Sequence, residues 1–102
     1  MSEHVEVTAG GMPTVGIGTW QNTDPEACAR AVETALEVGY RHVDTAQAYD
    51  NEADVGRGIA NANVDREDVF LATKVWIDSL APEAVKRTTK ESLDRLGVDA
   101  VD

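Results

Sequence analysis

The feature that most constrains the fold of this chain is a regular alternation of short apolar runs with amphipathic segments. Apolar runs that predict strands begin near residues 15, 41, 69 and 98, a spacing of 26–29 residues, and one helical segment lies between each pair. Parallel strands joined by right-handed helical crossovers produce this pattern. The predicted fold class is therefore α/β, either an open doubly wound sheet or a (β/α)8 barrel of the TIM type.

Local signals predict where these elements begin and end. Asp24 followed by Pro25 predicts the start of the first helix, and Gly39 predicts its end. Alternating residues at 5–8, followed by a pair of glycines, predict a short leading β-hairpin. The predicted strands occupy residues 15–18, 40–44, 69–74 and 98–102, and the second and third helices occupy residues 51–61 and 82–96.

Reactive side chains gather at the carboxyl ends of the predicted strands, and this favours the barrel. Thr19 and Trp20 follow the first strand. Asp44 ends the second strand, and Lys74 ends the third. The chemistry of a barrel lies at this end of successive strands. An open sheet favours a glycine-rich phosphate turn, but Gln21 stands where the third glycine of that fingerprint belongs.

The length of the chain limits how much of a barrel it can supply. At about 28 residues per strand–helix unit, eight units need roughly the 250 residues of a typical barrel. The chain has 102 residues, enough for three units and the start of a fourth. We therefore expect residues 1–102 to be the N-terminal part of a single barrel domain, truncated in its fourth strand.

Asp44, Tyr49 and Lys74 are the candidate catalytic residues. Alternation places Asp44 and Lys74 on the same face of neighbouring strands, where a carboxylate compensates the charge of an amine. A phenol has an ordinary pKa of about 10, and a nearby ammonium group favours its ionised form. The three residues therefore predict a proton donor, in which Tyr49 protonates a carbonyl oxygen as a hydride reaches the carbonyl carbon.

The same residues allow other interpretations. Asp44 and Lys74 could form a purely structural ion pair, and Lys74 could form a Schiff base with a carbonyl substrate. Trp20 and Trp76 follow the first and third strands, so together with Tyr49 they predict the walls of an apolar substrate pocket. Each tryptophan could equally serve packing alone.

Composition narrows the classes of partner. Nineteen acidic and nine basic residues give a net charge of −10, which disfavours nucleic acid and anionic membranes as partners. The same excess suggests a salt-adapted cytoplasmic protein. A single cysteine, Cys28, excludes an internal disulfide, and no metal site is expected. We expect neither a signal peptide nor a membrane span, because the chain has no basic, apolar leader and no long apolar run.

These motifs resemble the N-terminal part of the aldo-keto reductase family. The longest motif is Gly-Tyr-Arg-His-Val-Asp-Thr-Ala at residues 39–46, and it continues through Tyr49, Asn51 and Glu52 to Gly56. Further segments that carry the resemblance are residues 12–20, 66–76 and 93–102. The resemblance extends over nearly the whole chain.

This resemblance implies a (β/α)8 barrel that reduces aldehydes and ketones with NADPH, or less often with NADH. It implies Tyr49 as the proton donor, with Asp44 and Lys74 as its supporting pair. It also implies contacts to the nicotinamide from Thr19, Trp20 and Asp44. The family's catalytic histidine and adenosine-phosphate site would lie beyond the last residue, so we expect the isolated chain to be inactive.

Two functional hypotheses follow. The first is an oxidoreductase that acts on a small-molecule carbonyl compound. The alternative is a non-enzymatic cofactor-binding or regulatory subunit of the same fold. The presence of Asp44, Tyr49 and Lys74 together favours the enzyme, because a binding role would not require all three.

Overall fold

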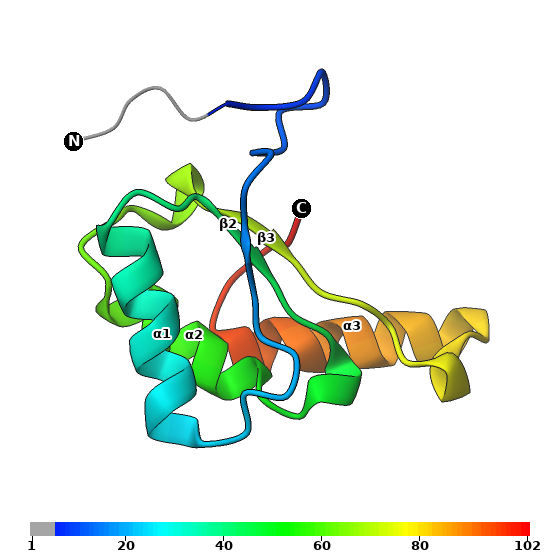
Figure 1. The fold of residues 1–102 in the computed structure, drawn as a ribbon. Helices are drawn as coiled ribbons and strands as arrows, with labels where there is room; N and C mark the ends of the chain where they lie inside the picture. The colour runs from blue at the N-terminus through cyan, green and yellow to red at the C-terminus, as the bar shows by residue number, and fades with distance from the viewer. Residues whose placement is uncertain (1–5) are drawn as a thin grey trace.

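The computed structural model describes residues 6–102 and contains three helices packed on a short sheet. The strands are β1 (Ile17–Gly18), β2 (His42–Asp44) and β3 (Phe70–Ala72), and the helices are α1 (Pro25–Glu37), α2 (Glu52–Asn61) and α3 (Pro82–Leu96). Short 3-10 turns in the connections are η1 (Gln47–Tyr49), η2 (Arg66–Asp68) and η3 (Ile77–Ser79). Figure 1 shows the helices on one side of the strands. Within the described residues, no helix has the length and apolar character needed to cross a membrane.

The sheet is parallel, with the strands in the order β1-β2-β3, and this confirms the predicted alternation of strands and helices. Ile17 pairs with Val43, which pairs in turn with Leu71. Each strand is two or three residues long, shorter than predicted, because a strand needs a partner backbone at every position and an apolar run does not. Val15, expected in a buried strand, is 62% exposed and lies outside β1.

The helix boundaries lie close to the predicted ones. Asp24 is the N-cap of α1 and Pro25 its first residue, but the Asp24 carboxylate makes no capping hydrogen bond. Gly39 follows the end of α1 with a φ of 120°, which favours glycine. The third helix has its predicted limits and ends at Gly97, whose left-handed φ of 71° is typical of a C-terminal glycine.

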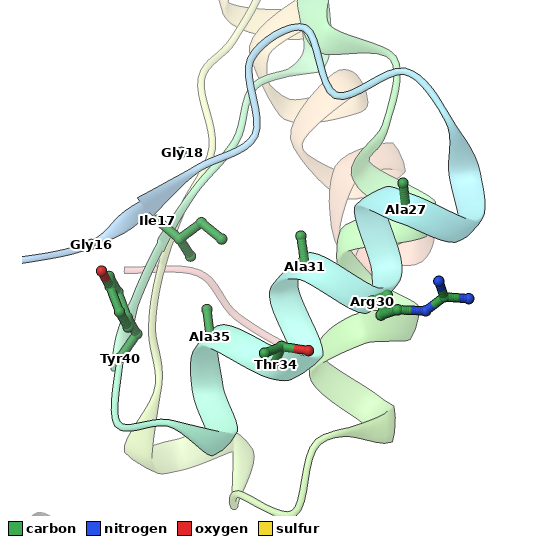
Figure 2. A pocket seen from close by; sticks show the side chains of 9 residues that line it. All are labelled: Gly16, Ile17, Gly18, Ala27, Arg30, Ala31, Thr34, Ala35 and Tyr40. Atoms are coloured by element: carbon green, nitrogen blue, oxygen red, sulfur yellow. The ribbon is translucent and has the colours of Figure 1, made fainter.

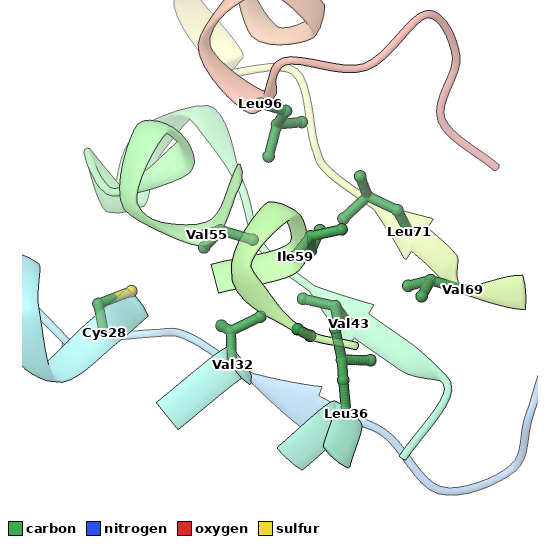
Figure 3. Close-up of a cluster of buried hydrophobic side chains, with 10 residues drawn as sticks. Cys28, Val32, Leu36, Val43, Val55, Ile59, Val69, Leu71 and Leu96 are labelled. Carbon is green, nitrogen blue, oxygen red and sulfur yellow. The ribbon is translucent and has the colours of Figure 1, made fainter. Parts of the chain in front are cut away.

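One apolar cluster fills the space between the helices and the sheet (Figure 3). Val43 and Leu71 are fully buried at the centres of β2 and β3. Because side chains alternate along a strand, His42 and Asp44 lie on the other face of β2. The helices contribute Cys28, Val32, Leu36, Val55, Ile59 and Leu96 to the cluster. The core cluster therefore packs on one face of the sheet, and His42 and Asp44 lie on the opposite face.

Two predicted elements differ in the structure. The leading hairpin is reduced to an isolated antiparallel bridge between Val7 and Pro13, because proline has no N–H group with which to extend a ladder. Residue 5 of that predicted hairpin lies outside the described residues. The predicted fourth strand is not formed within residues 6–102. There the Asp102 backbone N–H donates to the Leu71 carbonyl oxygen, and the Asp102 carboxylate accepts from the Leu71 N–H, so a side chain replaces part of the backbone ladder.

Candidate active site

The carboxyl ends of β2 and β3 bring Asp44, Tyr49 and Lys74 together. The Lys74 ammonium nitrogen lies 2.5 Å from Asp44 Oδ1 and 3.4 Å from the Tyr49 hydroxyl oxygen. It also donates to the Thr45 carbonyl oxygen at 3.1 Å, and it lies 5.1 Å from the centre of the Tyr49 ring. The amine therefore bridges a carboxylate and a phenol.

Tyr49 reaches Lys74 because the loop after β2 is bonded to the segment after β3. The Gln47 backbone N–H donates to the Lys74 carbonyl oxygen at 3.0 Å, and Gln47 Oε1 accepts from the Trp76 backbone N–H at 3.0 Å. Asp50 then takes a left-handed conformation, with a φ of 56°, and turns the chain into α2. No sequence signal marks Gln47, because a glutamine in a loop resembles any other polar loop residue.

The surroundings of Lys74 raise its pKa above the ordinary value. Burial lowers the pKa, but hydrogen bonds to Asp44 and to Tyr49 outweigh it. The side chains of Lys74 and Asp44 are 53% and 43% exposed, so water also screens their attraction. A charged amine is not a nucleophile, and this weakens the Schiff-base hypothesis.

A buried polar network, for which the sequence predicted no role, lies behind this ion pair. Asn51 is 2% exposed; it accepts from Thr45 Oγ1 at 3.0 Å and donates to the Thr19 carbonyl oxygen at 2.8 Å. Glu52 is 2% exposed and accepts from Thr73 Oγ1 at 2.6 Å. In the sequence, Asn51 and Glu52 appear only as an amide beside a carboxylate at the start of a predicted helix. Such a pair is common at helix starts and does not by itself indicate a buried network.

The other predicted contact residues lie around the same end of the sheet. Thr19 is 1% exposed, and its hydroxyl donates to Thr45 Oγ1 at 2.9 Å, so the Thr19 side chain faces inward. Trp20 is 68% exposed. Trp76 is 45% exposed, and its indole N–H donates to Asp78 Oδ2 at 3.2 Å. Neither indole is enclosed among the described residues, so their roles as pocket walls stay predictions.

Comparison with known proteins places this chain in a family. The model of the aldo/keto reductase family matches residues 11–102, which is most of the chain. The chain belongs to the aldo/keto reductase family. The resemblance stated from the motifs is therefore confirmed.

Individual aldo/keto reductases show the same similarity. An aldo-keto reductase of Mycolicibacterium smegmatis is 48% identical over 103 residues, covering 100% of this chain and 37% of the relative. Methylglyoxal reductase DkgB of Salmonella typhi is 47% identical over 91 residues, covering 89% of this chain and 34% of the relative. A crystal structure of a Bombyx mori aldo-keto reductase in complex with NADP matches with a TM-score of 0.87 and 37% identity, over 100% of this chain and 37% of that one. The chain thus spans about a third of the length of these relatives.

In this aldo/keto reductase segment, an open groove of about 670 Å³ lies between β1 and α1 (Figure 2). Its lining is mostly small and apolar, and consists of Gly16, Ile17, Gly18, Ala27, Arg30, Ala31, Thr34, Ala35 and Tyr40. Asp44, Tyr49 and Lys74 do not line it. The groove lies along the edge of β1 that has no partner strand among residues 6–102. It is therefore a feature of the open sheet edge and not of the candidate active site.

Proposed function

We propose that this chain is the part of an NADPH-dependent carbonyl reductase that supplies the proton donor. The observation that carries the proposal is the position of the Lys74 ammonium group, in contact with both Asp44 and Tyr49. A structural ion pair would need no phenol beside it. A subunit that only bound a cofactor would not need all three residues in this arrangement. The proposed reaction reduces an aldehyde or a ketone to an alcohol.

Tyr49 is suited to donate the proton in this reaction. Its hydroxyl oxygen accepts a hydrogen bond from Lys74, so its own proton is directed away from the amine and is available to a substrate. As the carbonyl carbon gains a hydride, the carbonyl oxygen takes this proton and the O–H bond of Tyr49 breaks. The phenolate that is left lies beside the charged amine, which stabilises it, and Asp44 holds the amine in place.

NADPH is the cofactor that we propose, and when bound it supplies the hydride. The Bombyx mori relative was crystallised with NADP. Asp44 is 43% exposed and has room to accept a second hydrogen bond, from the carboxamide of a nicotinamide. Trp20 is exposed at the end of β1 and would offer an aromatic face to the same ring. Thr19 would contribute through the shape of its turn, because its hydroxyl already donates to Thr45. NADH would meet the same residues.

The substrate class that we propose is a small carbonyl compound. The Salmonella typhi relative is a methylglyoxal reductase by name. Trp20 and Trp76 would wall the substrate pocket beside Tyr49. We also propose that the three strand–helix units form part of a (β/α)8 barrel, and that the chain alone does not turn over substrate, because β1 keeps an unpaired edge among the described residues.

The test uses a complete barrel, made by replacing the matching 91 residues of Salmonella typhi DkgB with those of this chain. We expect this chimera to oxidise NADPH in the presence of methylglyoxal. In the chimera, Tyr49→Phe should lower kcat by about 10²–10⁴-fold, the range of general acid catalysis, and leave the Kd for NADPH nearly unchanged. Tyr40→Phe is the matched control, because Tyr40 lies at the β1 groove and away from Lys74.

The same assays separate the competing functions. Equal turnover by Tyr49→Phe and the parent chimera would refute the proton-donor role. NADPH binding without turnover in the parent chimera would favour the non-enzymatic subunit. Covalent trapping of substrate on Lys74 by borohydride would favour the Schiff-base enzyme.

A further inference from the structure

Each member of the ion pair has a threonine neighbour in the chain. Thr45 follows Asp44, and Thr73 precedes Lys74. Side chains that are adjacent in an extended segment point to opposite faces. The Asp44 and Lys74 side chains meet each other, whereas the two threonine hydroxyls donate to the first residues of the α2 region. The threonines therefore connect the candidate active site to the helical layer.

Asn51 joins the ends of β1 and β2. Its Oδ1 accepts from Thr45 Oγ1 at 3.0 Å, and its Nδ2 donates to the carbonyl oxygens of Thr19 and Asn22 at 2.8 and 3.1 Å. Thr19 in turn donates to Thr45 Oγ1 at 2.9 Å. Asn51 is 2% exposed, and buried hydrogen bonds of this kind hold their partners in a narrow range of positions.

Glu52 joins the end of β3 to α3. Its Oε2 accepts from Thr73 Oγ1 at 2.6 Å, and its Oε1 accepts from Arg95 Nη2 at 2.6 Å and from Ser92 Oγ at 3.2 Å. The Glu52 side chain is 1% exposed. A buried carboxylate is tolerated only where a counter-charge and hydrogen bonds surround it, and here Arg95, Ser92 and Thr73 supply them. Its position is therefore closely determined.

We propose that Asn51 and Glu52 are positioning residues, which set the separation of Asp44 and Lys74 and so the contact of Lys74 with Tyr49. The catalytic meaning of this inference rests on the proposed function. The Asp44–Lys74 pair is about half exposed, and an exposed ion pair is too weak to determine its own geometry. The hydrogen bond between Thr45 and Asn51 is buried, and the one between Thr73 and Glu52 is partly buried. Water therefore weakens these bonds less than the ion pair, and they supply that geometry instead.

The experiment removes one of these threonine hydrogen bonds and measures the pKa of Lys74. Thr73→Val removes the hydroxyl that reaches Glu52 and keeps the shape of the side chain, while Thr73→Ser keeps a hydroxyl. Thr88→Val is the matched control, because the Thr88 hydroxyl donates to Ala84 within α3. The pKa of Lys74 is measured in the 102-residue chain by NMR of the lysine side-chain methylene groups, assigned by comparison with Lys74→Met.

We expect the pKa of Lys74 to fall by about 0.5 or more in Thr73→Val, about a threefold change in its protonation equilibrium. The reason is that the bond to Asp44, which favours the charged amine, loses its alignment. The pKa should recover in Thr73→Ser and stay at the parent value in Thr88→Val. An unchanged pKa in a folded Thr73→Val variant would overturn the proposal.

A second variant covers the case in which Thr73→Val does not fold. Thr45→Val cuts the link to Asn51 and should also lower the pKa of Lys74. Circular dichroism reports which variants are folded. If both valine variants unfold while Thr88→Val remains folded, the network has a structural role only, and the positioning role is wrong.

Turnover separates this inference from the proposed function. In the DkgB chimera, Thr73→Val should lower kcat with little change in KM, because a misplaced amine affects the proton donor and not substrate binding. Normal kcat despite a lowered pKa of Lys74 would overturn the catalytic meaning of the positioning. A lowered pKa of Lys74 in Thr73→Val, with no turnover by the parent chimera, would support the positioning and refute the proposed reaction.

Discussion

Asn51 shows how much of this structure depends on one buried amide. Its Nδ2 donates to two carbonyl oxygens, those of Thr19 and Asn22, and 2% of the residue is exposed. Asn51→Asp would place a carboxylate oxygen where a donor now stands. Two hydrogen bonds worth about 1 kcal/mol each would be lost and acceptors would face each other, so we expect the free energy of unfolding to fall by about 2–4 kcal/mol.

Urea denaturation at neutral pH measures this loss. Asn63→Asp is the control, because Asn63 is exposed and the substitution adds the same charge. Its effect should stay within about 0.5 kcal/mol. If both variants lose the same stability, the added negative charge is responsible, and the buried amide is not.

At the scale of the elements, α2 carries glycines where it meets the other two helices. A Cβ at Gly56 would lie 2.3 Å from the Leu96 carbonyl oxygen, and one at Gly58 would lie 2.6 Å from the Ala29 carbonyl oxygen. Glycine within a helix costs about 1 kcal/mol relative to alanine. The close packing of α1 and α3 against α2 offsets this cost.

Gly56→Ala should therefore destabilise the chain although it improves helix propensity. We expect a net loss of about 1–3 kcal/mol, because the methyl group meets backbone that cannot easily move. Thermal or urea unfolding gives the value. Ala60→Gly, at an exposed position of α2, measures the effect of helix propensity alone and should lower the free energy of unfolding by about 0.5–1 kcal/mol. A more stable Gly56→Ala variant would contradict the close contact.

The boundaries of an element could be predicted where the residues that determine them lie within the element or next to it. The limits of α3 follow from Pro82, Gly97 and a helical spacing of apolar residues, all within the segment itself. The strands are shorter than predicted because a ladder depends on the neighbouring backbone. The predicted fourth strand does not form among the described residues for the same reason. The Leu71 N–H donates to the Asp102 carboxylate and not to a backbone carbonyl oxygen.

At the scale of the whole molecule, one feature is the open groove between β1 and α1. Exposed apolar surface of this kind binds hydrophobic dyes such as anilinonaphthalene sulfonate. Ala31 lines the groove, so Ala31→Glu should lower the fluorescence of the bound dye without unfolding the helix. Ala81→Glu, exposed and outside the groove, adds the same charge and should leave the fluorescence unchanged. Equal effects of the two variants would mean that net charge governs dye binding.

The net charge of −10 also belongs to this scale. Several of the described ion pairs lie at the surface, among them Arg57 with Glu26 and Arg87 with Glu91. Salt screens such pairs. The salt-adapted character inferred from composition stays a prediction.

The sequence by itself determined the order of the strands and helices, and it identified Asp44, Tyr49 and Lys74 as residues that belong together. These inferences rest on periodicity, on capping residues and on chemistry at strand ends, which are properties of short segments. Only the tertiary structure decided that Asn51 and Glu52 join those strand ends. Their partners lie up to 43 residues away in the chain, and a hydrogen bond between distant residues leaves no periodic trace in a sequence.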